Sequence, residues 1–291
     1  MSAQQIHFGE YAPGMGKVLN EGQIRQYVEQ GWVSPIDVLS SDQAFECRLR
    51  LEEWEQMRGG KLPAHERSSA HILFPWIDDL MRNGKILDAV EDLIGPNILC
   101  WNSVFWIKEA ESESYVGWHQ DLEYWGLSNS EVVSIWVAIS DASEASGCMS
   151  VIPGSHKEIM AHDETYESKN LLSRGQELRI DISRRSIVSM PLKAGQVSFH
   201  NVRTAHGSGP NTTGDRRIGL SFHYMPTYTE QTLSEWDSAS LVRGVDKYNN
   251  FEHCPRPRKP LDSSSVEFHK LASDAMREII YKGADSNQRT L

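Results

Sequence analysis

The chain has 291 residues, of which 39% are hydrophobic and 24% are charged, so a collagenous or disordered protein is excluded. There are 29 Lys and Arg residues against 40 Asp and Glu residues, and the formal net charge at pH 7 is therefore −11. This excess of negative charge argues against binding to nucleic acid or to an anionic membrane surface, because both depend on cationic side chains near phosphate groups.

The first third of the chain is predicted to be mainly helical. Apolar side chains recur at helical spacing in several segments, and Gly31 ends the first of them. Ser40 or Ser41 is in place to cap the second helix, which has Phe45, Leu49 and Trp54 on one face. The expected elements are a helix at 19–30, a strand at 32–38, and further helices at about 41–57, 74–82 and 85–93.

From residue 96 onwards the pattern changes to short runs rich in Val, Ile, Phe and Trp, separated by Gly, Asn, Asp and Ser. This pattern is typical of an antiparallel sandwich or barrel. The expected strands are 98–108, 132–139, 149–152, 187–191, 196–199 and 217–224.

A last helix is predicted at about 265–282. Ser264 and Glu267 have the spacing of a capping box, and an apolar stripe is expected to pack against the sheet. The stripe consists of Leu271, Ala275, Met276 and Ile279. We therefore expect residues 1–291 to form a single domain, with N-terminal helices at about 19–95, a β core at about 96–230, and a C-terminal loop and helix at about 231–285.

Nothing in the sequence predicts an export signal or a membrane anchor. Residues 1–14 contain no basic stretch followed by an apolar run, and no segment approaches ~18 consecutive apolar residues. The four cysteines form no C-x-x-C pair and are too sparse for a disulfide scaffold. We therefore expect a soluble cytoplasmic protein whose cysteines are buried free thiols.

A histidine and an aspartate one residue apart are the first candidates for chemistry. On an extended segment the side chains of His119 and Asp121 would point to the same side. An imidazole and a carboxylate that converge can supply two of the three protein ligands in the 2-His-1-carboxylate site of non-haem Fe(II) enzymes. The pair alone is a weak signal, because a solvated or hydrogen-bonded pair is a common alternative.

A second cluster strengthens this interpretation. His206 stands just before a Gly-Ser-Gly turn, where a side chain at the mouth of a barrel can reach inward. Arg217 begins a predicted strand 11 residues later, and a guanidinium inside a barrel needs an anion such as a carboxylate. The alternative for Arg217 is an exposed hairpin charge, because Asp215 and Arg216 adjoin it.

These segments together resemble the phytanoyl-CoA dioxygenase family of Fe(II)- and 2-oxoglutarate-dependent oxygenases. The resemblance rests on His119-x-Asp121, then His206-Gly-Ser-Gly-Pro-Asn, and then Arg217, in this order. The segment 147–156, with its Pro-Gly-Ser-His turn, and the segment 19–38 agree with the family, so that roughly residues 15–230 are covered. The resemblance implies a mainly β fold with flanking α-helices, the cupin-like double-stranded β-helix or jelly roll, with a metal inside its mouth.

The resemblance also implies roles for individual residues. His119, Asp121 and His206 are the expected iron ligands and catalytic residues. Arg217 is expected to bind the distal carboxylate of 2-oxoglutarate, and Arg216 is a competing candidate for that role. The implied cofactors are Fe(II), the cosubstrate 2-oxoglutarate, and O2.

Two further residues, Ser208 and Trp136, match positions that contact the cosubstrate in this family. The implied reaction hydroxylates an unactivated C–H bond of a small metabolite or natural-product intermediate and releases succinate and CO2. Related halogenases replace the metal carboxylate with a small residue, so Asp121 favours hydroxylation over chlorination. Desaturation, epimerisation and demethylation remain open, because they begin with the same hydrogen abstraction.

The substrate itself is much less determined, although a small molecule is expected. The candidate substrate-binding residues near the mouth are Asn102, Trp118, Glu123, Tyr124 and Arg203. Glu123 would suit an amine, and an aromatic cage for a quaternary amine is a further alternative. An acyl-CoA substrate is not expected, because the chain shows no basic cluster for its phosphates. The sequence does not indicate an oligomeric state.

Three alternatives remain at this point. His200 is the nearest rival to His206 as a metal ligand, but it lacks the Gly-Ser turn that follows His206. A cupin-like metalloenzyme could use the same triad without 2-oxoglutarate, although it would have no need of a fixed guanidinium at Arg217. A binding protein on an inactive oxygenase scaffold is the third alternative, and an intact triad argues against it.

Overall fold

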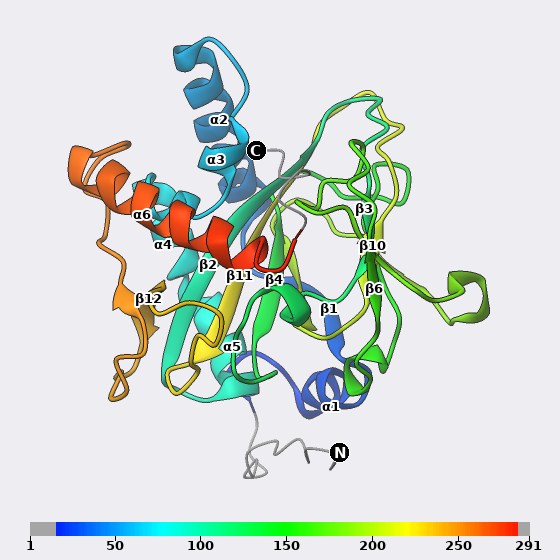
Figure 1. Cartoon of the computed structure of the whole chain (residues 1–291). Helices are drawn as coiled ribbons and strands as arrows, with labels where there is room; N and C mark the ends of the chain where they lie inside the picture. Colours follow the sequence, from blue (N-terminus) through cyan, green and yellow to red (C-terminus); the bar gives the residue numbers. More distant parts are fainter. Residues whose placement is uncertain (1–15, 285–291) are drawn as a thin grey trace.

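The computed structural model describes residues 16–284, which form two main β-sheets flanked by helices (Figure 1). The α-helices are α1 (Glu21–Gln30), α2 (Ser41–Arg58), α3 (Ala64–Arg67), α4 (Pro75–Met81), α5 (Gly84–Ile94) and α6 (Ser263–Ile280). The short 3-10 helices are η1 (Ala70–Ile72), η2 (Leu122–Tyr124), η3 (Ser155–Lys157) and η4 (Ile182–Arg184). The strands are β1 (Trp32–Asp37), β2 (Ile98–Lys108), β3 (Val116–His119), β4 (Val133–Ala138), β5 (Met149–Val151), β6 (His162–Glu164), β7 (Gln176–Leu178), β8 (Val188–Met190), β9 (Gln196–Asn201), β10 (His206–Ser208), β11 (Arg217–Pro226), β12 (Ser238–Arg243) and β13 (Glu252–His253).

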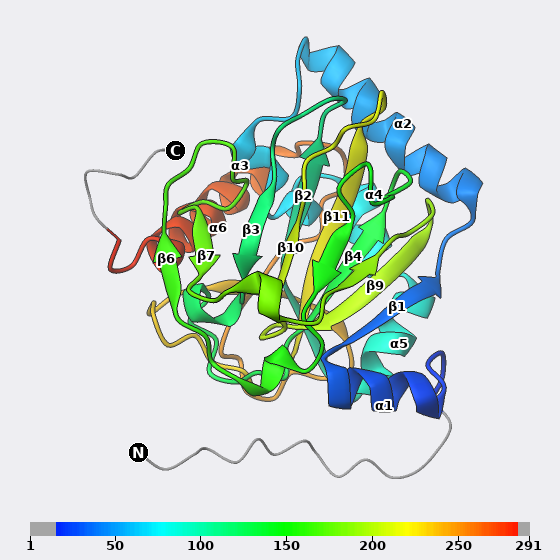
Figure 2. The ribbon, with the colours of Figure 1, turned by 90° about the vertical axis from the view of Figure 1, so that its right-hand side faces the viewer.

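The two sheets have the arrangement expected of a jelly roll. The larger sheet has the strand order β1-β9-β4-β11-β2-β12-β13, the smaller sheet has the order β3-β10-β5-β8, and β6 and β7 form a separate ribbon. All pairs except β12–β13 are antiparallel. The smaller sheet lies to the right of the larger sheet in Figure 1, and the turn of 90° in Figure 2 brings it toward the viewer.

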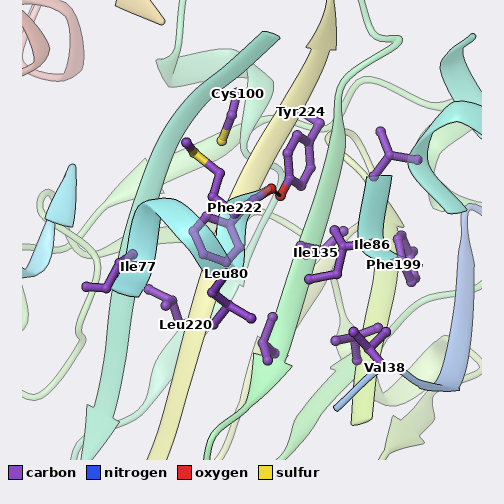
Figure 3. Close-up of a cluster of buried hydrophobic side chains, with 14 of the residues drawn as sticks. Val38, Ile77, Leu80, Ile86, Cys100, Ile135, Phe199, Leu220, Phe222 and Tyr224 are labelled. Atoms are coloured by element: carbon purple, nitrogen blue, oxygen red, sulfur yellow. Dashed lines mark hydrogen bonds between the residues drawn. The ribbon is translucent and has the colours of Figure 1, made fainter. Parts of the chain in front are cut away.

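The central strand β11 is buried along its whole length, but its two faces differ in chemistry. Leu220, Phe222 and Tyr224 point into the main hydrophobic core, together with Ile77 of α4 and Ile86 of α5 (Figure 3). Because side chains alternate along a strand, the residues between them face the smaller sheet. The polar and apolar alternation in residues 217–224 thus separates a dry core from a second, polar interior.

Local sequence signals explain where the first two helices begin. Asn20 and Gln23 form a capping box at α1, and Ser40 and Gln43 form another at α2, so Ser40 is the capping serine. Gly31 ends α1 with a φ of 82°, a left-handed conformation that glycine adopts at low cost. The predicted helix and strand that precede residue 38 are confirmed.

The predicted apolar face of α2 is wrong for two of its three residues, since Trp54 does pack against Phe74 and the main core. Phe45 is 59% exposed and Leu49 is 36% exposed. The buried residues of α2 are instead Ala44, Leu51 and Glu55. The helix turns this side inward because the Glu55 carboxylate accepts hydrogen bonds from the guanidinium of Arg216 and from the N–H of Leu62.

The last helix, α6, also differs from the prediction. It begins at Ser263 with Asp262 as its N-cap and shows no side-chain capping bond, so the predicted capping box is wrong. Ser264 already lies in the first turn, where it cannot act as the cap. Leu271 is 57% exposed, and the buried stripe consists of Ser265, His269, Ala272, Met276 and Ile279. In Figure 1, α6 crosses in front of the larger sheet.

The expected long strands are all present, whereas several short strands are not indicated by the sequence. These are β3, β6, β7, β10, β12 and β13. Most of them have only two or three residues and few β-branched or aromatic side chains, so their strand character comes from pairing with neighbours.

Among the described residues no helix is long and apolar enough to span a membrane. Residues 1–14, in which no export signal is expected, lie outside the described part of the chain.

Candidate metal centre

Two paired strands of the smaller sheet bring two histidines together. His119 of β3 lies opposite His206 of β10, and the centres of their rings are 4.2 Å apart. Asp121 follows the end of β3, and its N–H donates to the carbonyl oxygen of Val202 over 3.1 Å. The expectation of an extended segment through Asp121 is wrong, because this residue has helical angles of φ −72° and ψ −44°. A turn therefore brings the carboxylate to the imidazoles.

The three side chains have the burial and geometry of a metal-binding cluster. They are buried, and their potential ligand atoms lie within 4.8 Å of one another, the one such cluster found in residues 16–284. Nδ1 of His119 lies 2.8 Å from the carbonyl oxygen of Gly117, and Nδ1 of His206 lies 2.9 Å from that of Thr204. Because a carbonyl only accepts, each Nδ1 carries the proton, and each Nε2 keeps a lone pair for a metal.

The charges of this cluster also suit a divalent cation. Burial alone would raise the pKa of Asp121, but the neighbouring His206 and the contact with the imidazole of His119 outweigh it and hold the pKa below its usual range. Burial, followed by the effect of His119, lowers the pKa of His206 to about 4. At pH 7 Asp121 is therefore an anion and His206 a neutral imidazole, as metal binding requires.

His200 lies beside the cluster but is less well prepared to bind a metal. Its Nε2 is 4.0 Å from Oδ2 of Asp121, and its ring centre is 4.5 Å from that of His206. Neither ring nitrogen of His200 has a hydrogen-bond partner among the described residues, so no carbonyl sets its tautomer. This difference favours His206 over His200 as the second histidine ligand.

A chain of hydrogen bonds reaches Asp121 from the larger sheet. Oγ of Ser134 lies 3.5 Å from Oδ2 of Asp121 and 3.0 Å from Nδ1 of His223. Nε2 of His223 lies 3.2 Å from Oγ of Ser221. No sequence motif marks His223, and only the register of β11 with β4 reveals its place beside Asp121.

Arg217 is buried in the same interior without a counter-ion. It is only 3% exposed, and its Nε and Nη2 have no hydrogen-bond partner among the described residues. The guanidinium lies 5.3 Å from the ring centre of Trp136, and burial lowers the pKa of Arg217 to about 10. Trp136 covers Gly219 so closely that a Cβ there would come within 1.8 Å of the indole. A buried guanidinium with free N–H groups fits a carboxylate ligand.

Arg216 does not share this environment. It forms ion pairs with Glu55 at 2.7 Å and with Glu109 at 3.1 Å. Consecutive side chains of an extended segment point to opposite sides, so Arg216 faces α2 while Arg217 faces the interior. The alternative in which Arg216 binds the distal carboxylate of 2-oxoglutarate is therefore disfavoured, because its guanidinium is already neutralised by these ion pairs.

Lys108 is a residue near this site that sequence reasoning missed. It is opposite Arg217 in the β11–β2 pair, and its Nζ donates to Oγ of Ser208 over 2.6 Å and also to the carbonyl oxygen of Gly209. Burial, together with the charge of Arg217, lowers the pKa of Lys108 to about 6. The signal available in the sequence was a lysine at the end of an apolar strand, and its pairing with Arg217 is seen only in the structure.

A cavity of about 540 Å³ joins these groups. This volume lies within the ~300–1,000 Å³ usual for small-molecule sites. His119, Asp121, His206, Arg217, Ser208, Trp136 and His200 line it, and so do two of the five candidate substrate residues, Asn102 and Tyr124. The sequence-predicted metal and cosubstrate residues thus share one interior space with part of the predicted substrate set.

Three substrate candidates lie outside the cavity, which corrects their predicted place. Trp118 is half-buried and packs against the cluster that contains Ile152 and Met160. Glu123 is exposed to solvent. Arg203 contributes its carbonyl oxygen to Nε2 of Gln120, and its side chain is not among the lining groups. The presence of many aromatic or polar residues in one stretch of the sequence did not indicate which of these side chains face the cavity.

The outer wall of the cavity comes from segments that carry no motif. It consists of Ala64, His65, Arg67 and Ser68 near α3, Leu171, Leu172, Ser173 and Gln176 before and in β7, and Ser273, Met276, Arg277, Ile280 and Tyr281 of α6 and its end. These segments meet only in the tertiary structure, and the apolar stripe of α6 was the one signal that this helix packs inward.

The family model of phytanoyl-CoA dioxygenase (PhyH) matches residues 51–219. The chain belongs to the phytanoyl-CoA dioxygenase family. It is 31% identical to the probable alpha-ketoglutarate-dependent hypophosphite dioxygenase of Stutzerimonas stutzeri over 205 residues, which are 69% of this chain and 68% of that protein. It is 28% identical to human peroxisomal phytanoyl-CoA dioxygenase over 48% of this chain and 43% of that enzyme, so less than half of that enzyme is matched.

A solved structure agrees with this membership. The non-heme monooxygenase ThoJ, in its apo form, is 29% identical, has a TM-score of 0.79, and is aligned over 89% of this chain and 98% of its own. Members of the phytanoyl-CoA dioxygenase family are Fe(II)- and 2-oxoglutarate-dependent dioxygenases, and the cofactors of this chain are Fe(II) and 2-oxoglutarate, with O2 as cosubstrate. The buried His-Asp-His cluster and the unpaired guanidinium of Arg217 fit these groups.

Proposed function

We propose that this protein hydroxylates an unactivated C–H bond of a small metabolite or natural-product intermediate, with release of succinate and CO2. The observation that supports it most is one cavity that contains both a buried His-Asp-His cluster and an unpaired, buried guanidinium. Iron and 2-oxoglutarate together supply the oxidation chemistry when they are bound. The carboxylate ligand favours hydroxylation over halogenation, because Asp121 occupies the position that a halide would need.

The residues of the cavity would divide the work in the following way. His119, Asp121 and His206 hold the metal through two imidazole nitrogens and one carboxylate oxygen. Arg217 pairs with the distal carboxylate of 2-oxoglutarate, while Lys108 and Ser208 add a second cation and a hydroxyl beside it. The backbone carbonyls of Gly117 and Thr204 keep the two imidazoles in the tautomer that exposes Nε2.

The aromatic side chains keep water away from these groups. Trp136 lies against Arg217 and over Gly219, so the guanidinium is fixed and shielded before a ligand arrives. Trp125 packs edge-on against His223 at 4.5 Å between ring centres. A preorganised environment of low polarity around Arg217 strengthens each charged contact, which supports a site for a doubly charged cosubstrate.

The other reactions open to this scaffold are less well supported. A cupin-like metalloenzyme that works without 2-oxoglutarate would have no use for the buried, unpaired Arg217. Desaturation, epimerisation and demethylation remain alternatives that depend on the substrate. The hydroxylase proposal rests on Asp121, and two relatives are named as dioxygenases, one of hypophosphite and one of ectoine.

A spectroscopic experiment tests the cofactor part of this proposal. Anaerobic protein with Fe(II) and 2-oxoglutarate should show a weak metal-to-ligand charge-transfer band in the visible region, and subsequent admission of O2 should produce succinate. Iron binding without any band would contradict it. A product with one added oxygen atom from 18O2 would then identify a hydroxylase, whereas a product two hydrogen atoms lighter would identify a desaturase.

We also propose a domain organisation, a cellular compartment and a class of partner for this protein. We propose one oxygenase domain, which is supported by a cavity that residues from α3 to α6 line together. We also propose a reducing compartment such as the cytoplasm, which the four free cysteines support. The partner is proposed to be a small molecule, as it is for the ectoine dioxygenases among the relatives.

A further inference from the structure

The charged side chains that line the cavity are mainly cationic. Of the described residues that line it, Asp121 is the sole carboxylate, whereas Arg67, Arg217 and Arg277 bring three guanidinium groups. The whole chain carries a net charge of −11. Arg217 is buried, Arg67 is half-buried and Arg277 is exposed, so the cations extend from the interior of the cavity to its mouth. A cationic cavity in an acidic protein indicates a ligand preference, because charges that line a cleft attract ions of the opposite sign.

Two of these three guanidinium groups have no assigned partner. Arg217 is reserved for 2-oxoglutarate under the proposed function. Arg67 uses its Nε on the carbonyl oxygen of Leu62, and no carboxylate oxygen of the described chain lies within ion-pairing distance of Arg67 or Arg277. Burial lowers the pKa of Arg67, and the more distant Glu109 and Glu55 do not offset this effect.

Other buried arginines near the site are neutralised, which makes the contrast informative. Arg174 is ion-paired with Glu164 and donates to the carbonyl oxygen of Ile280 over 2.9 Å. The hydroxyl of Tyr281 donates to the carbonyl oxygen of Ser173 over 2.9 Å. These contacts fix the end of α6 against the segment before β7, so the face that α6 presents to the cavity is held in place.

That face of α6 carries an unsatisfied hydroxyl beside a cation. Ser273 and Arg277 are four residues apart and lie one turn from each other on the same side of the helix. Oγ of Ser273 is buried and has no hydrogen-bond partner among the described residues, although a helical serine can bond to the carbonyl oxygen four residues earlier. Met276 and Ile280 flank this pair with apolar surface.

We propose that the substrate is an organic anion, an apolar body that bears a carboxylate or phosphonate-like group, and that Arg277 and Ser273 of α6 bind this group together with Arg67 of α3, which lines the same cavity. Leu171 and Leu172 then contact the apolar body together with Met276 and Ile280. A cationic substrate is disfavoured, because it would meet three guanidinium groups and no free carboxylate. This assignment rests on the proposed function only in that it reserves Arg217 for 2-oxoglutarate.

Binding of matched probes tests this assignment without turnover. The protein is loaded with Zn(II) and saturating 2-oxoglutarate, which occupies Arg217, and titrated calorimetrically with 3-phenylpropionate, 3-phenylpropylphosphonate, 3-phenylpropanol and 3-phenylpropylamine. At least one anion should bind about tenfold more tightly than the alcohol, because a charged hydrogen-bonded contact is added. The amine should bind more weakly than the alcohol. The stronger of the two anions identifies the acid class.

Variants of α6 locate the effect. Arg277→Gln should bring the anion down to the affinity of the alcohol, and Arg277→Glu should reverse the order of anion and amine. Lys270→Gln is the matched control, because Lys270 is an exposed cation two turns earlier on the same helix and does not line the cavity, and it should leave all four affinities unchanged. Circular dichroism checks that each variant is folded.

Two outcomes overturn the assignment. One is the absence of any preference for the anions, including no measurable binding of any probe. The other is an anion preference that Arg277→Gln leaves intact. The proposed function fails separately, through a missing charge-transfer band in the wild-type protein with Fe(II) and 2-oxoglutarate, and Arg277→Gln should retain that band.

Discussion

The two faces of the larger sheet are equally buried but chemically opposite. On the face covered by α4 and α5, called the helix-covered face, Leu220 and Phe222 pack in the main core, and the phenol of Tyr224 donates a hydrogen bond to the carbonyl oxygen of Met81 over 2.7 Å. On the other face, Arg217 and His200 have nitrogen atoms without partners. Burial alone therefore does not distinguish the two faces, whereas satisfaction of polar groups does.

This difference indicates where the fold serves stability and where it serves ligands. An unsatisfied buried polar group costs on the order of 1–3 kcal/mol, so its presence on one face points to a partner that arrives with the cofactors. Substitutions on neighbouring residues of one strand should then have opposite consequences. Those on the helix-covered face should lower stability, and those on the cavity face should lower ligand binding.

The largest effect is expected for the carboxylate of the metal cluster. Asp121→Ala removes the anionic ligand, and turnover of 2-oxoglutarate should fall by more than about 100-fold, beyond the loss typical for an outer-shell partner. Iron content and succinate formation measure the change. Glu123→Ala is the matched control, since Glu123 is exposed nearby, and an equal loss in that variant would contradict the assignment.

On the opposite face, Phe222→Ala should lower the free energy of unfolding by roughly 3–5 kcal/mol, because it leaves a cavity in the main core. Ser221→Ala on the same strand should lower it less, by about 1–2 kcal/mol, because it leaves no large cavity but removes the acceptor of the hydrogen bond from Nε1 of Trp106. Chemical denaturation measures both. Similar losses for the two neighbours would show that the faces do not differ as described.

A third comparison separates two adjacent arginines. Arg217→Ala should weaken 2-oxoglutarate binding by about 10- to 100-fold, because a charged bidentate contact is lost. Arg216→Ala should leave this affinity unchanged and lower the stability instead, since it removes the partner of the buried Glu55. Titration of the charge-transfer band and thermal melting report the two effects. An exchange of the two phenotypes would reassign the carboxylate anchor.

A smaller, pH-dependent effect is expected at Lys108. Without ligand its pKa is about 6, so the amine is mostly neutral at pH 8, and a bound dicarboxylate would favour the protonated form. The affinity for 2-oxoglutarate should therefore weaken as the pH rises from 6 to 8, by at most about tenfold per unit. Lys108→Met should flatten this dependence, measured calorimetrically with Zn(II) protein. An unaltered pH profile in the variant would exclude Lys108 as its source.

The smallest change is expected for Tyr224→Phe. It removes one hydroxyl that donates to the carbonyl oxygen of Met81, and the free energy of unfolding should fall by about 1 kcal/mol. Iron and 2-oxoglutarate binding should be unaffected, because the side chain lies on the helix-covered face. A loss of ligand binding without a loss of stability would reverse the roles of the two faces.

Much of the fold could be predicted because its signals are local. The capping residues Asn20 and Ser40 mark the starts of α1 and α2, and the alternation of residues 217–224 marks a strand with two different faces. Predictions failed where a contact with a distant segment decided the outcome. Glu55 turns α2 toward Arg216, so that Phe45 is exposed, and α6 begins too early for Ser264 to cap it.

For the function, the sequence by itself determined the family and the identity of the candidate cluster, because His119, Asp121, His206 and Arg217 lie in short motifs with family-like spacing. Only the tertiary structure decided which arginine is unpaired. It also placed Lys108 beside the cosubstrate site and α6 on the wall of the cavity. The reason is that strand register and helix docking join residues from distant parts of the chain. No short stretch of sequence encodes the outer wall, and this wall is where we place substrate recognition.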